Sequence, residues 1–404
     1  MTQHELEHLL FDDILAPAET LREHGLLTEI LERSGATVHD FVPLLERALT
    51  RSPAEAKHEL LRAVCELGGA LDLYDMLASW PPARLARALV AGIDWSEVDE
   101  PKVTLRRMRQ RLEGATRALA PVPNLMFMRD PCFAVGGRII VGRMATEARA
   151  REPRLVSFAL SHSGVVSAPE LAFLPTGLAH SPPYQRLEGG DVLVLSPRQL
   201  LIGCSQRTSA QTIERLAEEA LFPLFPELER LYAVLMPEAR TVMHLDTVLT
   251  QLDERLFLGY APLCTEAEAM PLARLTRDRG VVALRGASVL DVLKDELGAD
   301  TALVPCGGSE RLHQEREQWT DGANAIALAP GHVMLYARNV HTIAALVEHG
   351  FTEVAVHLVQ PEEQRAELVR TAMTAPRAVI SFPSGELSRA RGGARCLTMP
   401  LARA

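Results

Sequence analysis

The sequence lacks any long, uninterrupted apolar run, and this absence excludes a chain that crosses a membrane as a helix. None of its hydrophobic stretches approaches the roughly 18 residues that such a helix requires. The N-terminal residues are acidic and amphipathic and do not resemble a signal peptide. Net positive charge is also missing, since the 404 residues carry a formal charge of -10. Nucleic acids and membrane surfaces bind clustered cations, so we expect neither as a partner.

Cysteines are few and scattered. The six lie at positions 65, 132, 204, 264, 306 and 396, without close pairs or the short spacings of zinc ligands. We therefore expect neither a disulfide framework nor a zinc site, and we predict reduced thiols in a cytoplasmic protein. Lysine is scarcer still, with 3 among the 42 cationic residues, which fits a coding bias and carries no functional conclusion.

The N-terminal part of the chain is dominated by helical patterns. Apolar residues recur at helical spacing over 19–34, Gly35 then ends the pattern, and an extended run over 37–42 follows. From 44 to 118 the pattern stays helical, with a capping box and an N-terminal proline at 52–55 and further helices over 82–91 and 102–119. We predict a helical bundle over 44–118, inserted into an α/β domain of residues 1–43 and 119–404.

After Val122 short β-branched runs alternate with helices. The predicted strands cover 138–142, 191–195, 200–203, 241–249, 255–259, 332–336, 354–358 and 378–382, with a helix over 209–221. Strands that come in close pairs fit a simple alternating parallel sheet poorly. Repeated units of two paired strands and one helix fit better, although no repeat of fixed period is visible.

Cys396 is the first candidate for chemistry. It follows two glycines, which allow close backbone approach, and it lies between arginines, whose charge favours a thiolate. A thiolate attacks electrophilic carbon. The competing interpretation is a small buried apolar residue near the C-terminus.

Three further polar segments stand out from apolar surroundings. Asp130 precedes a proline in 123–131, and Glu188 and Asp191 flank a glycine pair in 187–191. Both patterns also occur in ordinary turns. In 242–249, which we predict to be a strand, His244 and Asp246 are two residues apart and would share one face. Such a pair either satisfies itself in a core or lines a site, because burying it without partners costs several kcal/mol.

The number of carboxylates is itself informative. Acids close to a thiol raise its pKa and suppress the thiolate unless a cation is also present. The substrate could supply that cation. A guanidinium offers five N–H donors in a planar fork, which suits carboxylates on two sides.

Taken together, these segments resemble the bacterial arginine deiminase family. The matching stretches, in order, are LLFDDIL at 9–15, PNLMFMRDP, GCSQRTS at 203–209, REQWTDGAN at 316–324 and GGARC, together with LEGGD and MHLDT. The resemblance implies a five-bladed α/β propeller (pentein) with an inserted helical bundle. It also implies hydrolysis of L-arginine to L-citrulline and ammonia without a metal or organic cofactor, by a homo-oligomer, either a dimer or a tetramer.

The resemblance also implies residue roles. Cys396 is the nucleophile, His244 the general acid and base, and Glu188 orients His244, while Asp130 and Asp246 bind the guanidinium. The residues implied for the rest of the substrate are Asn124, Phe127, Arg149, Asp191, Arg207 and Arg391.

Two features depart from the family pattern. Members usually carry further residues before the LLFDDIL segment, so we expect one blade to be incomplete at the N-terminus. Arg395 stands where a histidine is frequent, and the extra cation is expected to lower the pKa of the thiol or to shift the pH optimum.

Three alternatives stay open. A related guanidine-modifying enzyme, such as an agmatine deiminase or an amidinotransferase, would use the same fold, but three arginines suit a substrate with a carboxylate. A non-catalytic arginine-binding scaffold is the second alternative. The third is a divalent metal held by His244, Asp246 and nearby acids.

Overall fold

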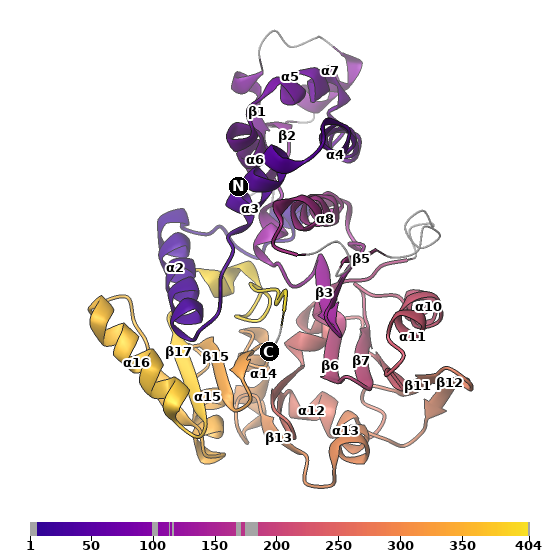
Figure 1. Cartoon of the computed structure of the whole chain (residues 1–404). Helices are drawn as coiled ribbons and strands as arrows, with labels where there is room; N and C mark the ends of the chain where they lie inside the picture. Colours follow the sequence, from indigo (N-terminus) through magenta and orange to yellow (C-terminus); the bar gives the residue numbers. More distant parts are fainter. Residues whose placement is uncertain are drawn as a thin grey trace.

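The computed structural model describes residues 6–98, 104–112, 114, 117–166, 171–173 and 185–402. Within this part of the chain, short strands form five separate sheets, with helices between them. Figure 1 shows most of the sheets in one body, with the helices of the N-terminal part stacked above it. The predicted α/β class is confirmed. None of the helices in the described ranges combines the length and the apolar character that crossing a membrane requires.

The body repeats one unit: an antiparallel strand pair, a helical segment, and a further strand that returns parallel to the second strand of the pair. The first unit contains β3 (Cys132–Val135), β4 (Arg138–Val141), α8 (Glu152–Ser163) and β5 (Leu171–Phe173). The second contains β6 (Val192–Ser196), β7 (Gln199–Cys204), α10 (Ala210–Leu216), α11 (Phe222–Leu224) and β8 (Arg230–Leu235).

The last two units carry additions. The third contains β9 (Leu249–Asp253), β10 (Leu256–Gly259), α12 (Ala261–Cys264), α13 (Val289–Leu297) and β13 (Ala302–Pro305), while its hairpin of β11 (Leu272–Thr276) and β12 (Gly280–Leu284) extends the second sheet. The fourth follows α14 (Arg311–Trp319) and contains β14 (Ile326–Ala329), β15 (His332–Tyr336), α15 (Val340–Glu348), β16 (Thr352–Ala355), α16 (Glu362–Thr374) and β17 (Ala378–Phe382). The predicted pairing of two strands recurs in each unit, but the prediction lacked the further parallel strand, and the last two units contain two helices instead of one.

Apolar side chains join each unit to the next. One buried cluster connects β3 and β4 with the second sheet, another connects that sheet with β9 and β10, and a third connects β9 and β10 with β15 and β17. All five residues of β17 are buried, as expected for a strand covered on both faces. The units therefore follow one another in space as they do in the sequence.

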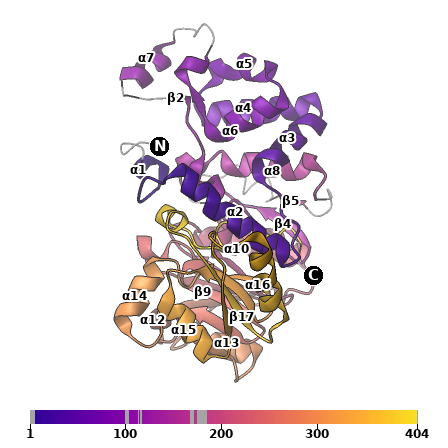
Figure 2. The same cartoon turned by 90° about the vertical axis from the view of Figure 1, so that its left-hand side faces the viewer.

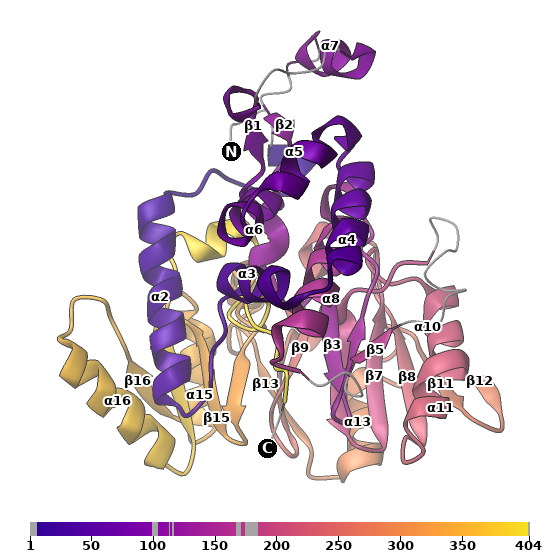
Figure 3. The ribbon, with the colours of Figure 1, turned by 45° about the horizontal axis from the view of Figure 1, so that its top comes forward.

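The helical part contains α3 (Phe41–Arg51), α4 (Ala54–Leu67), α5 (Tyr74–Ser79), α6 (Pro82–Ala91) and α7 (Leu105–Leu112), with a two-stranded sheet of β1 (Ile93–Asp94) and β2 (Arg117–Leu119). Figure 3 shows these elements at one end of the molecule. Their apolar core also includes side chains of α8, β3 and β4, so it is continuous with the first unit. The predicted boundaries at 44 and 118 stay a prediction.

Helix α2 (Pro17–Arg33), which follows the short α1 (Leu6–Leu9), matches the helix predicted over 19–34. Pro17 occupies its first position, and Leu26, Leu27 and Ile30 pack on the fourth unit. Gly35 ends it with a φ of 97°, a conformation that glycine adopts without strain. Figure 2 shows α2 across the body, next to α16.

Several local predictions were wrong. Residues 37–40 form no strand and helix α3 begins at Phe41, because helical spacing buries Leu44, Leu45 and Ala48. The end of the helix predicted over 102–119 is β2, paired with β1. The capping box is absent: Pro53 is the N-cap of α4, and the Ser52 hydroxyl lies 3.4 Å from the Leu49 carbonyl instead.

The strand predicted over 241–249 was also wrong. Two 3-10 turns, η9 (Arg240–Val242) and η10 (Leu245–Thr247), precede β9. The Leu245 N–H donates to Asp191 Oδ1 at 2.9 Å and the Thr247 N–H to the His244 carbonyl at 3.1 Å, so these groups do not enter a strand ladder. The shared strand face that we predicted for His244 and Asp246 therefore does not exist.

Candidate active site

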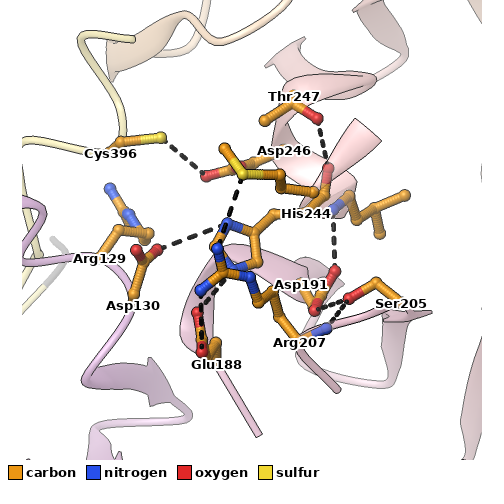
Figure 4. Close-up of polar contacts among 12 residues, drawn as sticks. Arg129, Asp130, Glu188, Asp191, Ser205, Arg207, His244, Asp246, Thr247 and Cys396 are labelled. Carbon is orange, nitrogen blue, oxygen red and sulfur yellow. Dashed lines mark hydrogen bonds and ion pairs between the residues drawn. The ribbon is translucent and has the colours of Figure 1, made fainter. Parts of the chain in front are cut away.

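The loops that lead into the first strands of the four units supply polar side chains to one place. Asp130 precedes β3, Glu188 precedes β6, Asp246 precedes β9, and Asn324 precedes β14. Cys396 follows the 3-10 turn η11 (Leu387–Ala390) in the last loop. Figure 4 shows Cys396, His244 and the carboxylates gathered around one centre. The repeated connection of the units explains why residues far apart in the sequence meet here.

Cys396 is buried, and its Sγ lies 3.8 Å from Oδ2 of Asp246. Its backbone N–H donates to Oδ1 of Asn324 at 3.1 Å, and its carbonyl accepts from the Arg129 N–H, also at 3.1 Å. Burial, followed by the charges of Asp246 and Asp130, raises the pKa of the Cys396 thiol well above its usual range. The free protein therefore holds a protonated thiol at neutral pH.

His244 lies between two carboxylates. Its Nε2 is 2.9 Å from Glu188 Oε2, and its Nδ1 is 3.7 Å from Asp130 Oδ1. Burial alone would lower the pKa of His244, but the charge of Asp130 and the hydrogen bond to Glu188, together with Asp191, raise it to about 9. The imidazole is therefore protonated at neutral pH, with a proton to donate.

Glu188 stays ionised although it is fully buried. Burial raises its pKa, but the hydrogen bond with His244 and the charges of Arg207 and Arg149 outweigh burial and lower the pKa to about 2. Its Oε1 also accepts the Ala145 N–H at 2.8 Å. Glu188 therefore provides a fixed negative charge behind the histidine.

Only one of the two carboxylate oxygens of Asp130 accepts a hydrogen bond within the described ranges. Arg149 donates to its Oδ2 at 2.6 Å, whereas no donor in the described part of the chain reaches the buried Oδ1. Arg149 is held in turn by Glu152, which accepts from its Nε and Nη2, and by the Asn124 carbonyl at 3.2 Å. The structure thus places Arg149 against Asp130, with all its neighbours buried.

The two carboxylate oxygens of Asp246 also differ in their contacts. Its Oδ2 faces Cys396 Sγ and lies 3.6 Å from Nε of Arg395, while its buried Oδ1 has no hydrogen-bond partner within the described ranges. Burial raises the pKa of Asp246, and the charge of Arg395 opposes this shift. Two carboxylates beside a thiol thus each keep one oxygen free.

The other two predicted arginines, Arg207 and Arg391, contact different residues. Arg207 Nη1 is 3.7 Å from Glu188 Oε1. Arg391 stacks on Trp319, with its Cζ 3.7 Å from the ring centroid, and its guanidinium donates to the carbonyls of Trp319 and Arg240. Its Nε is also 3.3 Å from Asp12. Both arginines are buried although neither is bound by a close bidentate carboxylate.

Asn124 and Phe127 lie in the 3-10 turn η4 (Pro123–Met126) and just after it. The Asn124 amide donates to the Leu9 carbonyl at 2.5 Å. The Phe127 ring packs on Gly392, where a Cβ would come within 2.2 Å of it, so only glycine fits.

Asp191, predicted among the substrate ligands, faces the protein. Its Oδ1 accepts from the Leu245 N–H and its Oδ2 from the Ser205 hydroxyl at 2.7 Å (Figure 4). Burial raises the pKa of Asp191 to about 7. The carboxyl group ties the loop that carries His244 to the second unit.

Comparison with known proteins identifies the family. The sequence model of the arginine deiminase family matches residues 7–403. An arginine deiminase of Listeria monocytogenes serotype 4a is 33% identical over 411 residues, covering 100% of this chain and 92% of the relative. An arginine deiminase of Bacillus cereus is 30% identical over 416 residues with the same coverage. This chain belongs to the arginine deiminase family.

Solved structures give weaker matches to this arginine deiminase family member. A dimethylarginine dimethylaminohydrolase of Pseudomonas aeruginosa, complexed with citrulline, has a TM-score of 0.41 at 16% identity, covering 78% of this chain and 94% of that one. The N-terminal domain of a cyanobacterial arginine dihydrolase, bound to product, has a TM-score of 0.41 at 15% identity, covering 74% and 86%. Scores this low do not establish a shared architecture.

The sequence reasoning missed two residues of this family member's site. Asn324 accepts from the Cys396 N–H and donates to the Asp246 carbonyl at 3.0 Å, so it links the two loops. Its only sequence signal was its place at the end of the REQWTDGAN segment. The second residue is Glu152, which accepts a hydrogen bond from Arg149. Burial raises the pKa of Glu152 to about 7, although the charge of Arg149 acts to lower it. No local pattern around position 152 marked it.

A metal remains one interpretation of part of the site. Oxygen and nitrogen atoms of Asp130, Glu188 and His244 lie within 4.8 Å of one another, a spacing that suits a cation. However, the Arg149 guanidinium already lies 2.6 Å from Asp130 and 3.7 Å from Glu188. A protein cation therefore supplies the positive charge that a metal would bring.

Proposed function

We propose that this protein hydrolyses L-arginine to L-citrulline and ammonia, with Cys396 as the nucleophile and His244 as the general acid and base. One observation carries the proposal: Asp130 and Asp246, on two sides of a buried thiol, each keep one carboxylate oxygen that accepts no hydrogen bond within the described ranges, although Asp130 Oδ1 also lies 3.7 Å from His244 Nδ1. A planar guanidinium can pair with both oxygens at once. Its central carbon would then lie within reach of Cys396 Sγ.

The free site supports activation by the substrate. Acids hold Cys396 as a thiol and His244 as an imidazolium. A guanidinium between Asp130 and Asp246 would neutralise the acids that suppress the thiolate and so lower the pKa of Cys396. The nearest acceptor for the thiol proton is Asp246 Oδ2, at 3.8 Å.

The first half of the reaction then forms a C–S bond and breaks a C–N bond. The sulfur electron pair attacks the guanidinium carbon and gives a tetrahedral adduct. His244 transfers its proton to one terminal nitrogen, which leaves as ammonia with the electrons of the C–N bond. The product of this half is an S-alkylthiouronium on Cys396, with His244 neutral.

The second half uses the same histidine as a base. Neutral His244 takes a proton from water, and the hydroxide adds to the thiouronium carbon. Collapse of this adduct forms the ureido carbonyl of citrulline, breaks the C–S bond and returns the electron pair to sulfur, which takes the hydroxyl proton and becomes the thiol again. Glu188 stabilises the imidazolium that forms in each cycle.

The rest of the substrate would bind beside Arg207 and Arg391, whose buried guanidinium groups suit an α-carboxylate. Phe127 would cover the aliphatic part and Asn124 its polar end. We assign Arg149 to holding Asp130, and Asp191 to positioning the His244 loop, on the contacts that each makes.

For the architecture we propose a five-bladed α/β propeller with a helical bundle inserted at 44–118. Four similar units that pack in sequence order support it. Helix α2 and the Cys396 segment, which share a core with the fourth unit, would belong to a fifth unit. A homo-oligomer in the cytoplasm completes the proposal.

Citrulline formation from L-arginine tests the function. Replacement of the nucleophile in Cys396→Ala is expected to lower kcat by at least ~10⁴-fold. Cys204→Ala, at a thiol in β7, serves as the matched control and should keep the wild-type rate. Acid quenching of the wild-type protein during turnover of L-arginine should trap the thiouronium adduct, and peptide mass mapping should place it on Cys396. An unmodified Cys396 in a protein that still turns over would overturn the mechanism.

Substrate choice separates the related enzymes. Agmatine lacks the carboxylate and would leave Arg207 and Arg391 without an anion, so its kcat/KM should be at least ~10²-fold below that of L-arginine. Comparable values for the two substrates would favour an agmatine deiminase. Activity that survives exhaustive chelation is also expected, whereas loss on chelation with recovery on metal addition would support the metal interpretation.

A further inference from the structure

One buried carboxyl group near the centre has no role in the chemistry above. Asp321 lies in the turn between α14 and β14 and is only 4% exposed. Within the described ranges, no donor forms a hydrogen bond with its Oδ2. A buried acceptor without a partner costs free energy, so such a group indicates a partner that the protein itself does not supply.

The backbone at Asp321 is also unusual. Its φ is 61°, in the left-handed region that L-residues other than glycine rarely occupy. Of the four non-glycine residues with positive φ in the described ranges, only Asp321 and Arg391 are buried polar residues. Local strain of this kind is typical of functional sites, because the surrounding structure must hold the residue in place.

The turn that carries Asp321 connects the two ends of the proposed substrate site. At one end, the Trp319 carbonyl and ring hold the Arg391 guanidinium. At the other end, Asn324 holds the Cys396 N–H and the Asp246 carbonyl. The Asn324 N–H also donates to the Asp321 carbonyl at 3.0 Å. Asp321 thus lies between the residue proposed for the α-carboxylate and the nucleophile.

Electrostatics agree with this placement. Burial raises the pKa of Asp321 to about 7, and the charges of Asp246 and Asp12 act in the same direction. The charges of Arg391 and Arg338 act to lower this pKa. Asp321 in turn helps to raise the pKa of the Cys396 thiol. The carboxyl group is therefore close enough to respond to charges at both ends of the site.

We propose that Asp321 binds the α-ammonium group of the substrate and so selects α-amino acids among guanidino compounds. This inference rests on the proposed function. L-Arginine carries three charged groups, and the residues assigned above account for its guanidinium and its carboxylate but not for its ammonium. A buried carboxylate with one oxygen that accepts no hydrogen bond within the described ranges, and with a pKa that responds to the carboxylate-binding Arg391, supplies the missing partner.

The test compares two ligands that differ only in the α-amino group: L-arginine and 5-guanidinopentanoate. Binding is measured by calorimetry in the Cys396→Ala background, so that no turnover occurs. Asp321→Asn is the informative variant, because asparagine has the same shape and also tolerates a positive φ. Asp300→Asn, at an exposed residue paired with Arg255, is the matched control.

We expect Asp321→Asn to weaken L-arginine binding by roughly 10–100-fold, as the loss of one charge-assisted hydrogen bond predicts, and to change 5-guanidinopentanoate binding by less than about 3-fold. The control should change neither. An equal loss of affinity for both ligands would show that Asp321 has a structural role. An unchanged affinity for both ligands would show that Asp321 does not contribute to binding. Both results overturn the inference while leaving the proposed function intact. If the Cys396→Ala protein with Asp321 intact binds neither ligand, the proposed function fails as well.

Discussion

At the scale of single residues, the site holds its reactive groups in forms that cannot react without substrate. Nearby acids stabilise both the Cys396 thiol and the His244 imidazolium, and Asp130 acts on both groups. Deprotonation of the thiol requires a new positive charge between those acids. The site thereby avoids a permanent thiolate, which oxidants would attack in the absence of substrate.

Glu188→Gln should therefore change the pH dependence of the reaction. Without this anion the pKa of His244 falls from about 9 toward its ordinary 6.5, although Asp130 and Asp191 still raise it. The imidazolium required for ammonia release is then lost at a lower pH. We expect the alkaline limb of kcat/KM against pH to move down by one to two units, with kcat at pH 8 about 10–100-fold lower. Glu219→Gln, in an exposed ion pair, is the control. An unmoved alkaline limb would show that Glu188 does not set the charge of His244.

Gly190→Ala should separate positioning from stability. A Cβ at Gly190 would lie 2.8 Å from the His244 ring and 3.0 Å from Asp130 Oδ1, so the ring must move. A displacement of this size in a catalytic group costs about 10²-fold in rate. We expect kcat to fall by that factor while thermal unfolding shows that the fold is retained. A wild-type kcat in Gly190→Ala would mean that the close contact between Gly190 and the His244 ring does not position the histidine.

At the scale of elements, regular patterns were predictable and irregular connections were not. Helix α2 has buried apolar residues at helical spacing and strand β17 is a short, continuously buried run, and both lie where the sequence predicted them. The segment around His244 has strand-like composition, but Asp191 takes its backbone N–H and holds it in a turn. That partner is distant in the sequence, so no local pattern could reveal it.

The same limit applies to the site. The family and the cluster of Cys396, His244 and acids were predictable, because each lies in a distinctive segment. The family prediction is confirmed. Asn324 and the pairing of Arg149 with Asp130 depend on how the four units meet in space, which the sequence does not state.

Gly25→Ala tests the stability of α2. Gly25 lies inside this helix, and no atom lies within 4 Å of the position that a Cβ would take. Alanine there reduces the freedom of the unfolded chain and favours the helix, so the free energy of unfolding should rise by about 0.5–1 kcal/mol. Urea denaturation measures the change, and citrulline formation should stay at the wild-type rate. A lower stability would show that α2 does not pack as described.

At the scale of the whole molecule, the N-terminal segment fastens the loop that carries the nucleophile. Asp12 lies 3.3 Å from Arg391, and Asp13 lies 2.6 Å from Arg389. Glu23 accepts backbone N–H groups of Glu386 and Leu387. Contacts across most of the chain length therefore hold the segment that ends in Cys396, so assembly of the site requires the two ends of the chain to come together.

The buried acids set how the stability of the whole molecule depends on pH. Burial raises the pKa values of Glu152, Asp191 and Asp321 to about 7, although nearby positive charges and hydrogen bonds oppose the shift. Between about pH 4 and 7 the folded state therefore binds more protons than the unfolded state. His244, with its pKa raised to about 9 by the acids around it, extends this excess from 6.5 to about 9. Stability must then fall as pH rises through this window. Glu188, with its pKa lowered to about 2, acts in the opposite sense, and its contribution is lost below about pH 4.5.

We therefore expect the free energy of unfolding to be greatest near pH 4 and to decrease toward pH 9, as measured by urea denaturation at constant ionic strength. Saturating L-arginine, added to the Cys396→Ala variant, should flatten the decrease, because a bound cation stabilises the ionised acids and binding favours the folded state. His244→Gln should remove the part of the slope above pH 7. Stability that increases steadily from pH 5 to 9 would contradict the assigned protonation states, since it requires acids with lowered pKa values to dominate.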